Sequence, residues 1–267
     1  MKTIYQKSEK SGFSLVELSI VLVILGLLTG GILSGQSLIR AAELRSVTTE
    51  YERYTTAVGT FREKYFGLPG DLSNAESFWT SGTKNGDGNG QIKGSAPDTA
   101  DTNETSHFWA QLAKAGLIEG NYTPSKWSTN TAGTTNPKAR LNSANWNIRY
   151  VGIVGQDDTV VGTTGDATQI AFEGNYGNAF FLISGTNLSA PAGGVMKAEE
   201  AWNIDTKMDD GKPALGNVGS LESQGSATAG AGCSDKAPKK DVDLTGSAYS
   251  VTNTSATACS LVFKTGW

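Results

Sequence analysis

The sequence predicts an α+β protein in which one long N-terminal helix packs on an antiparallel β-sheet. Two observations lead to this prediction. A helical pattern runs from residue 13 to residue 66, and the second half of the chain is rich in short β-forming segments. Glycine accounts for 33 of the 267 residues, which is typical of a domain with many turns and loops.

The first half of the long helix, residues 13–39, is an almost continuous apolar run. It contains a single charged residue, Glu17, and it exceeds the roughly 20 residues that a helix needs to cross a bilayer. A secretory signal peptide is a poorer explanation, because the run is too long and no A-x-A-like cleavage site closes it. The preceding segment, residues 1–12, contains three lysines, which favour the cytoplasmic side. The rest of the chain is therefore expected outside the cytoplasm.

The second half of the helix, residues 40–66, is amphipathic. Charged residues such as Glu50 fill the positions between the apolar ones, and Gly67 and Pro69 end the helix. The apolar stripe therefore predicts packing on a globular domain, and a coiled coil is the weaker alternative because the heptads stop after three. The stripe consists of Leu44, Val47, Tyr51, Tyr54, Val58, Phe61 and Tyr65, spaced alternately by three and four.

The residues at the start of the apolar run form a specific motif. Residues 11–17 read Ser-Gly-Phe-Ser-Leu-Val-Glu. This segment resembles the processing site of the type IV pilin and type II secretion pseudopilin family. The resemblance, which is sharp over about residues 11–70, implies cleavage between Gly12 and Phe13 by a prepilin peptidase and N-methylation of Phe13.

The same resemblance implies a fold, partners and a location. The fold would be pilin-like, and the partners would be other copies of the chain, related pilins and an inner-membrane assembly platform. The precursor would be anchored in the inner membrane with its remainder in the periplasm. The mature protein would then form a periplasmic or extracellular filament.

Glu17 has a physical role in this interpretation. A lone carboxylate in hydrocarbon costs several kcal/mol and marks a functional site by default. Paired with the new amine of Phe13, within or between subunits, it would offset much of that cost and set the register of one subunit on the next.

Residues 67–267, the head, are predicted to form the α+β domain with inserted loops. A glycine-rich loop is expected at 84–95, an exposed loop at 125–136 and a turn at 205–211. A short apolar turn is expected at 74–79. The predicted short helices are 104–118 and 195–204, and the predicted strands are 145–154, 169–172, 178–184, 212–221, 247–252 and 260–264.

The chain has two cysteines, Cys233 and Cys259. Both lie in the part expected outside the cytoplasm, where disulfides persist. A bridge would close a loop of roughly 25 residues and stabilise the fold by about 3 kcal/mol. Two unpaired thiols are the alternative. A C-terminal disulfide loop is common in the family that the N-terminus resembles, which agrees with the bridge.

The head contains one candidate metal site, for calcium. Residues 85–90 match the start of a D-x-[DN]-x-[DN]-G calcium loop, with Asn85, Asp87, Asn89 and the Gln91 carbonyl as ligands. The carboxylate expected at the twelfth position is replaced by Ala96, and the turn that follows could supply one from Asp98, Asp101 or Glu104. A Gly/Asn-rich hairpin turn without metal is the alternative. A second acidic segment, 205–211, is predicted to be a solvated turn, and calcium binding there is the alternative that the resemblance to pseudopilins implies.

Composition argues against enzymatic and nucleic-acid functions. The formal charge is −4 without a basic patch, and the single histidine, His107, is expected at the surface or partly buried on a helix. The tryptophans could line a contact with a glycan or a protein, but core packing is the simpler use for most of them. The sequence therefore predicts a structural subunit of a type IV pilus or type II secretion pseudopilus. The alternative is a minor or tip subunit that acts as an adhesin or binding module.

Overall fold

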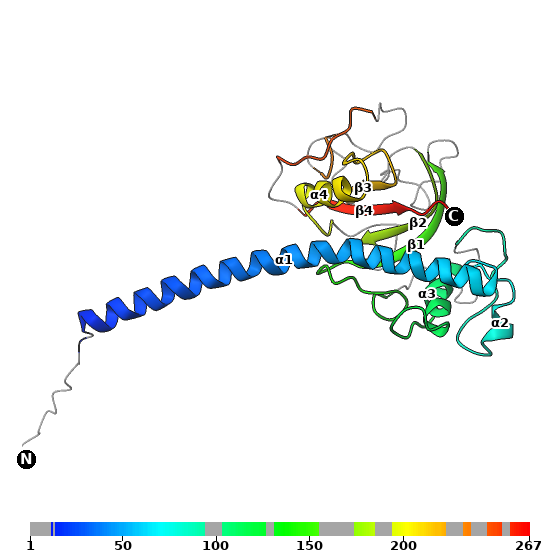
Figure 1. Cartoon of the computed structure of the whole chain (residues 1–267), viewed down its shortest axis with the longest axis horizontal. Helices are drawn as coiled ribbons and strands as arrows, with labels where there is room; N and C mark the ends of the chain where they lie inside the picture. Colours follow the sequence, from blue (N-terminus) through cyan, green and yellow to red (C-terminus); the bar gives the residue numbers. More distant parts are fainter. Residues whose placement is uncertain are drawn as a thin grey trace, which may run out of the picture. The chain divides into compact units, whose positions relative to one another are not determined.

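The computed structural model describes residues 12, 14–93, 103–126, 131–154, 174–184, 194–222, 232–235, 245–252 and 257–267 (Figure 1). The chain divides into two units. The apolar helix unit reaches to Ala42, and the globular unit begins at Glu43 and continues to Trp267.

Helix α1 comprises Leu15–Tyr65, in agreement with the predicted 13–66. In the apolar helix unit its large apolar side chains are exposed, and the most apolar 18-residue window has a mean hydropathy of 2.4 with none of it buried. The helix is therefore long and apolar enough to cross a membrane. Phe66, which follows the last turn, has a positive φ of 57°.

The described part of the globular unit contains a four-stranded sheet in the order β1-β2-β4-β3. All three neighbouring pairs are antiparallel, which confirms the predicted sheet. At Gly152 the β1–β2 register shifts, and its φ of 71° is one that glycine adopts readily. The strands are β1 (Asn145–Val154), β2 (Gly174–Ile183), β3 (Val218–Glu222) and β4 (Cys259–Lys264).

Three predicted strands had other outcomes. The predicted strand 212–221 begins only at Val218, because Lys212 to Asn217 form the turn that brings the chain to the sheet edge. Residues 247–252 contribute only an isolated bridge, Ser234↔Tyr249, instead of a strand. The predicted strand 169–172 lies outside the described residues.

The core lies between one face of the sheet and the second half of α1. Tyr51 stacks on Phe263 of β4 with ring centroids 4.8 Å apart, and Tyr54 meets Trp109 and Trp146 edge to face. Val47, Val58 and Phe61 complete the buried stripe, as predicted. Each such side chain contributes about 1.5–3 kcal/mol when fully buried, so the stripe fixes α1 to the sheet. The opposite face carries a smaller buried cluster with Phe181, Ile183, Leu221 and Val262.

Three shorter helices complete the described globular unit: α2 (Ala75–Phe78), α3 (Glu104–Lys114) and α4 (Ala198–Met208). Helix α3 ends four residues before the predicted Ile118, and Leu117 is partly buried beyond it. Helix α4 continues four residues past the predicted end at Ile204, so Asp205 lies in a helix and not in a turn. Asp205 is fully buried, contrary to the predicted solvated turn.

One charged residue, Glu50, and one polar segment, 125–136, are more buried than the sequence predicted. Glu50 of α1, expected on the solvent side, is buried because its carboxylate accepts hydrogen bonds from Trp146 Nε1 at 2.7 Å and the Arg140 amide at 3.0 Å. The 125–136 segment is not fully exposed either. Its Thr135 and Asn136 are buried, and Asn136 Nδ2 donates to Asn145 Oδ1 and to the Trp146 carbonyl.

The disulfide forms as predicted between Cys233 and Cys259. Cys259 is the first residue of β4, and both cysteines are fully buried. The bond therefore holds residues 232–235 against a strand that lies between β2 and β3.

Candidate processing segment and acidic cluster

The predicted processing site lies at the exposed start of the apolar helix unit. Gly12 and Ser14 are exposed, and Phe13 is outside the described residues. Exposure is what a peptidase needs at the bond that it cuts.

Glu17 makes a local hydrogen bond that the sequence analysis did not anticipate. Its Oε2 accepts the backbone amide of Ser14 at 2.9 Å, and Ser14 Oγ accepts the amide of Val16 at 3.3 Å. Ser-x-x-Glu is the sequence pattern of a capping box, in which the serine side chain accepts an amide of the first helical turn and the glutamate side chain accepts the amide of the N-cap residue. Glu17 therefore caps α1 in the single chain, a role that the spacing of Ser14 and Glu17 could have predicted.

The predicted calcium ligands lie in a loop that uses several of its own oxygens for hydrogen bonds. Asn85 Oδ1 accepts the Glu76 amide at 2.8 Å, and Asn89 Oδ1 accepts the Gln91 amide at 2.7 Å. Asp87 accepts both the amide and the side-chain nitrogen of Asn89. Calcium binding by these residues stays a prediction.

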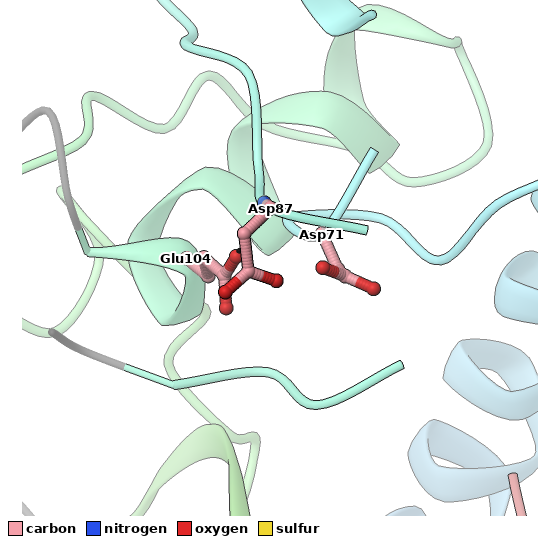
Figure 2. Close-up of side chains that lie close together, drawn as sticks. All are labelled: Asp71, Asp87 and Glu104. Carbon is pink, nitrogen blue, oxygen red and sulfur yellow. Dashed lines mark hydrogen bonds between the residues drawn. The ribbon is translucent and has the colours of Figure 1, made fainter. Parts of the chain in front are cut away.

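Among the predicted ligands, Asp87 is part of a cluster of three carboxylates that the fold assembles from distant segments. Asp71 follows the end of α1, Asp87 lies in the loop, and Glu104 is the first residue of α3 (Figure 2). One carboxylate oxygen from each lies within 4.8 Å of the other two. Glu104 was one of the three acids considered for the missing ligand, whereas Asp98 and Asp101 lie outside the described residues.

The loop fits closely around Asp71. Its carboxylate accepts the amides of Gly88, Asn89 and Gly90 at 2.7–3.1 Å. A Cβ added at Gly86 would lie 2.4 Å from the Asp71 backbone, so only glycine fits there. Sequence reasoning missed Asp71, because an aspartate after a Pro-Gly turn reads first as a turn residue.

Glu104 holds the loop from the other side. Its two oxygens accept the amides of Asp87 at 3.1 Å and Lys93 at 3.0 Å. Burial raises the pKa of Glu104 to about 7; its hydrogen bonds lower it in part, and nearby Asp71 and Asp87 raise it further. Burial also raises the pKa of Asp71.

Asn178 of β2 connects this loop to the sheet. Its Oδ1 accepts the Ile92 amide at 2.9 Å, and its Nδ2 donates to the carbonyls of Gly90 and Trp267. The loop is thus held by hydrogen bonds to three side chains, those of Asp71, Glu104 and Asn178. Chemically, the cluster offers carboxylate oxygens, which are the ligands that calcium prefers.

Two other predicted residues have different surroundings from those expected. His107 is buried in α3, more fully than the predicted surface or partly buried position, and its Nδ1 accepts the Lys84 amide at 3.3 Å. Asp205 accepts the Tyr249 hydroxyl at 2.7 Å and the Gly211 amide at 3.1 Å. Burial raises the pKa of Asp205 to about 7, with Asp210 and Asp209 adding to the shift. Both residues therefore have structural hydrogen bonds inside the globular unit.

The comparisons with known proteins concern the N-terminal segment. Residues 7–33 match the prokaryotic N-terminal methylation motif, the prepilin-type cleavage and methylation segment that is typical of type IV pilins and type II secretion pseudopilins. Neither a curated protein nor a solved structure matches the chain. The matched residues include Gly12, Phe13 and Glu17, and they extend to Leu33 of the apolar helix unit.

Proposed function

We propose that this chain, which carries a prepilin-type methylation motif, is a structural subunit of a type IV pilus or of a type II secretion pseudopilus. Prepilin peptidase cuts the bond between Gly12 and Phe13 and methylates the new amine. The mature subunit leaves the inner membrane through the assembly platform and polymerises with other copies through residues 13–39. Its product is a periplasmic or extracellular filament.

The observation that carries this proposal is the exposed apolar surface of the helix in which the motif lies. The apolar side chains of Leu15 to Ile39 are exposed in the described chain, and a surface of this kind is too costly to leave in water. Lipid covers it in the precursor, and the helices of other copies cover it in the filament. The exchange of lipid for protein is driven by close packing of helices, which the small residues Gly26, Gly30 and Gly35 favour.

The alternative is a minor or tip subunit whose globular unit binds a surface or an exported protein. The large size of that unit, from Glu43 to Trp267, favours this candidate. The two roles differ in abundance. A major subunit occurs along the whole of a sheared filament, whereas a tip subunit is scarce in it.

The test is the mass of the mature protein. The full chain is expressed in a bacterium with and without prepilin peptidase, and intact protein from membranes and shed material is weighed. We expect a chain that begins with methylated Phe13 only when the peptidase is present. A mature chain that keeps residues 1–12, or that begins at another residue, would overturn the proposal.

A further inference from the structure

The globular unit contains acceptor sequences for N-linked glycosylation, which have the pattern Asn-x-Ser/Thr with any residue except proline at x. The pattern occurs in the chain at Asn103, Asn121, Asn187 and Asn253. Transferases of the bacterial type also select an acidic residue two positions before the asparagine. Two of the sequences meet this condition, residues 101–105 (Asp-Thr-Asn-Glu-Thr) and residues 119–123 (Glu-Gly-Asn-Tyr-Thr). The asparagines of the other two lie outside the described residues.

The fold closes the first of these two sequences. Asn103 is the N-cap residue of α3 and is only 1% exposed. Its Nδ2, the atom to which a glycan is attached, donates to the Ser125 carbonyl at 2.7 Å, and its Oδ1 accepts the Thr105 hydroxyl at 2.5 Å. The asparagine and the threonine of the pattern are both buried and are bonded to each other. A transferase therefore cannot reach them in the folded protein.

The second sequence lies in the loop after α3 and is open. Asn121 and Thr123 are exposed, and so are Glu119 and Gly120. The side chains of Asn121 and Thr123 form no hydrogen bond with another residue that the structure describes. A transferase can therefore bind both side chains without breaking a bond of the fold.

The backbone bends at the acceptor asparagine of this loop. Gly120 has a φ of 104°, and the Tyr122 hydroxyl donates to the Glu119 carbonyl at 3.1 Å. A Cβ at Gly120 would lie 2.7 Å from that hydroxyl, so the bend requires glycine. After the asparagine, the Thr123 amide donates to the Thr134 carbonyl at 2.9 Å. Hydrogen bonds thus hold the loop on both sides of an asparagine whose own side chain is exposed.

We propose that Asn121 is a site of N-linked glycosylation and that Asn103, which has the same sequence pattern, is not. The donor is an oligosaccharide linked to a lipid diphosphate, and the catalyst is a membrane oligosaccharyltransferase that acts outside the cytoplasm. Asn121 Nδ2 forms a bond to C1 of the first sugar as the bond from C1 to the diphosphate oxygen breaks. The lipid diphosphate leaves, and the amide proton passes to a base of the transferase.

This inference takes one point from the proposed function, which is the location of the globular unit outside the cytoplasm. It is independent of filament assembly. The two fail separately in one mass measurement, because cleavage and methylation change the N-terminal mass while a glycan adds mass at residue 121.

Coexpression tests the site in the full chain. The chain is produced in a bacterium with a bacterial oligosaccharyltransferase and its lipid-linked oligosaccharide, and in the same strain with an inactive transferase. We expect the intact chain to gain the mass of one oligosaccharide only with the active enzyme, and peptide mapping to place it on Asn121. A chain that gains no mass, or gains it only at another residue, would overturn the proposal.

Two substitutions test the recognition of the pattern. Thr123→Val keeps the shape of the side chain but removes the hydroxyl, and Glu119→Gln removes the charge. Both should lower the glycosylated fraction by about tenfold or more, because a site built to bind a polar group rejects the analogue that lacks it. Both residues are exposed, so the variants should melt within a few degrees of the parent. An unchanged glycosylated fraction in Thr123→Val would contradict N-linked modification at this sequence.

Free peptides separate the effect of the fold from that of the sequence. Peptides of residues 99–107 and 117–125 contain the two patterns without the fold, and purified transferase with its donor should glycosylate both. In the folded full chain we expect about tenfold more glycan on Asn121 than on Asn103, because the opening of a buried segment is rarely populated. Equal modification of both asparagines in the folded chain, or a 117–125 peptide that is not modified, would overturn the proposal.

Discussion

Two functions can be assigned to the carboxylate of Glu17. In the single chain it accepts the Ser14 amide and so caps α1, while the processing motif predicts that it balances the charge of the Phe13 amine after cleavage. These functions need different properties of the side chain. Capping needs an oxygen acceptor, whereas charge balance needs a full negative charge.

Two substitutions separate these functions. Glu17→Gln keeps an acceptor for the Ser14 amide but has no charge, and Glu17→Ala has neither. We expect both variants to be inserted and cleaved, and both to lose most filament assembly, because the charge pair is the stronger interaction in a dry bundle. The measurement is filament yield relative to cleaved subunit. Normal yield from Glu17→Gln together with low yield from Glu17→Ala would assign the residue to capping alone.

Asp205 makes the stability of the globular unit depend on pH. Its pKa in the folded protein is raised from 3.8 to about 7, so the folded state holds the proton more tightly than the unfolded chain. The corresponding stability is complete below pH 4 and is lost as the pH rises through 7. We expect the protein to be more stable at pH 5 than at pH 8, with Asp205 contributing on the order of 2 kcal/mol of the difference.

Asp205→Asn tests how much Asp205 contributes to this pH dependence. The pKa values of Glu104 and Asp71 are also raised, and both residues stay in the variant. The difference in melting temperature between pH 5 and pH 8 should shrink in Asp205→Asn. Glu199→Gln, on the exposed side of the same helix, should leave the difference unchanged. An unaltered pH dependence in Asp205→Asn would show that this carboxyl titrates normally.

At the scale of elements, Glu50 joins α1 to β1 through one buried hydrogen bond. Glu50→Ala leaves Trp146 Nε1 and the Arg140 amide without their acceptor, and a buried donor without a partner costs about 1–3 kcal/mol. We expect a loss of about 2–4 kcal/mol in urea unfolding, a smaller loss for Glu50→Gln, and a change within about 0.5 kcal/mol for the exposed Glu52→Ala. A loss equal to that of Glu52→Ala would mean that the bond adds no stability.

The loop of residues 85–93 is the element on which calcium should act. Three carboxylates within 4.8 Å repel one another when ionised, and a bound cation removes that repulsion. We expect millimolar calcium to raise the melting temperature of the full chain in detergent at pH 8, and a chelator to reverse the rise. Glu104→Gln should abolish the response, whereas Glu76→Gln, an exposed acid beside the loop, should keep it. A melting temperature that does not change with calcium would mean that hydrogen bonds alone hold the loop.

At the scale of the whole molecule, the division at Ala42 and Glu43 predicts separable behaviour of the two units. A chain that begins at Glu43 lacks the exposed apolar residues but keeps the stripe from Leu44 to Tyr65 that packs on the sheet. We expect it to fold, to stay monomeric in sedimentation without detergent, and to melt within a few degrees of the full chain. Aggregation of this fragment would show that residues before Glu43 are needed to complete the globular unit.

The features that could be predicted from the sequence depend on local patterns. The alternating spacing from Leu44 to Tyr65 predicted the buried stripe, the run at 145–154 predicted β1, and the two cysteines predicted their bond. Each of these signals lies within one segment or within a single residue type.

The features that escaped prediction depend on contacts between distant segments. Asp71 and Glu104 are 33 residues apart and meet only because the loop between them folds back on both (Figure 2). The sequence around Glu50 predicts a solvated charge, because its hydrogen-bond donor, Trp146, lies 96 residues later in the chain. His107 and Asp205 are buried for the same reason, since their partners Lys84 and Tyr249 belong to other segments.

The disulfide has a consequence for cleavage of the chain by a protease. Cys233 and Cys259 enclose the chain between them, and Cys259 opens the strand that lies between β2 and β3. A nick anywhere in the enclosed stretch leaves the two pieces covalently attached, so the last strand is not shed. On an electrophoresis gel such a nicked molecule keeps its full mass until a reducing agent releases the C-terminal fragment.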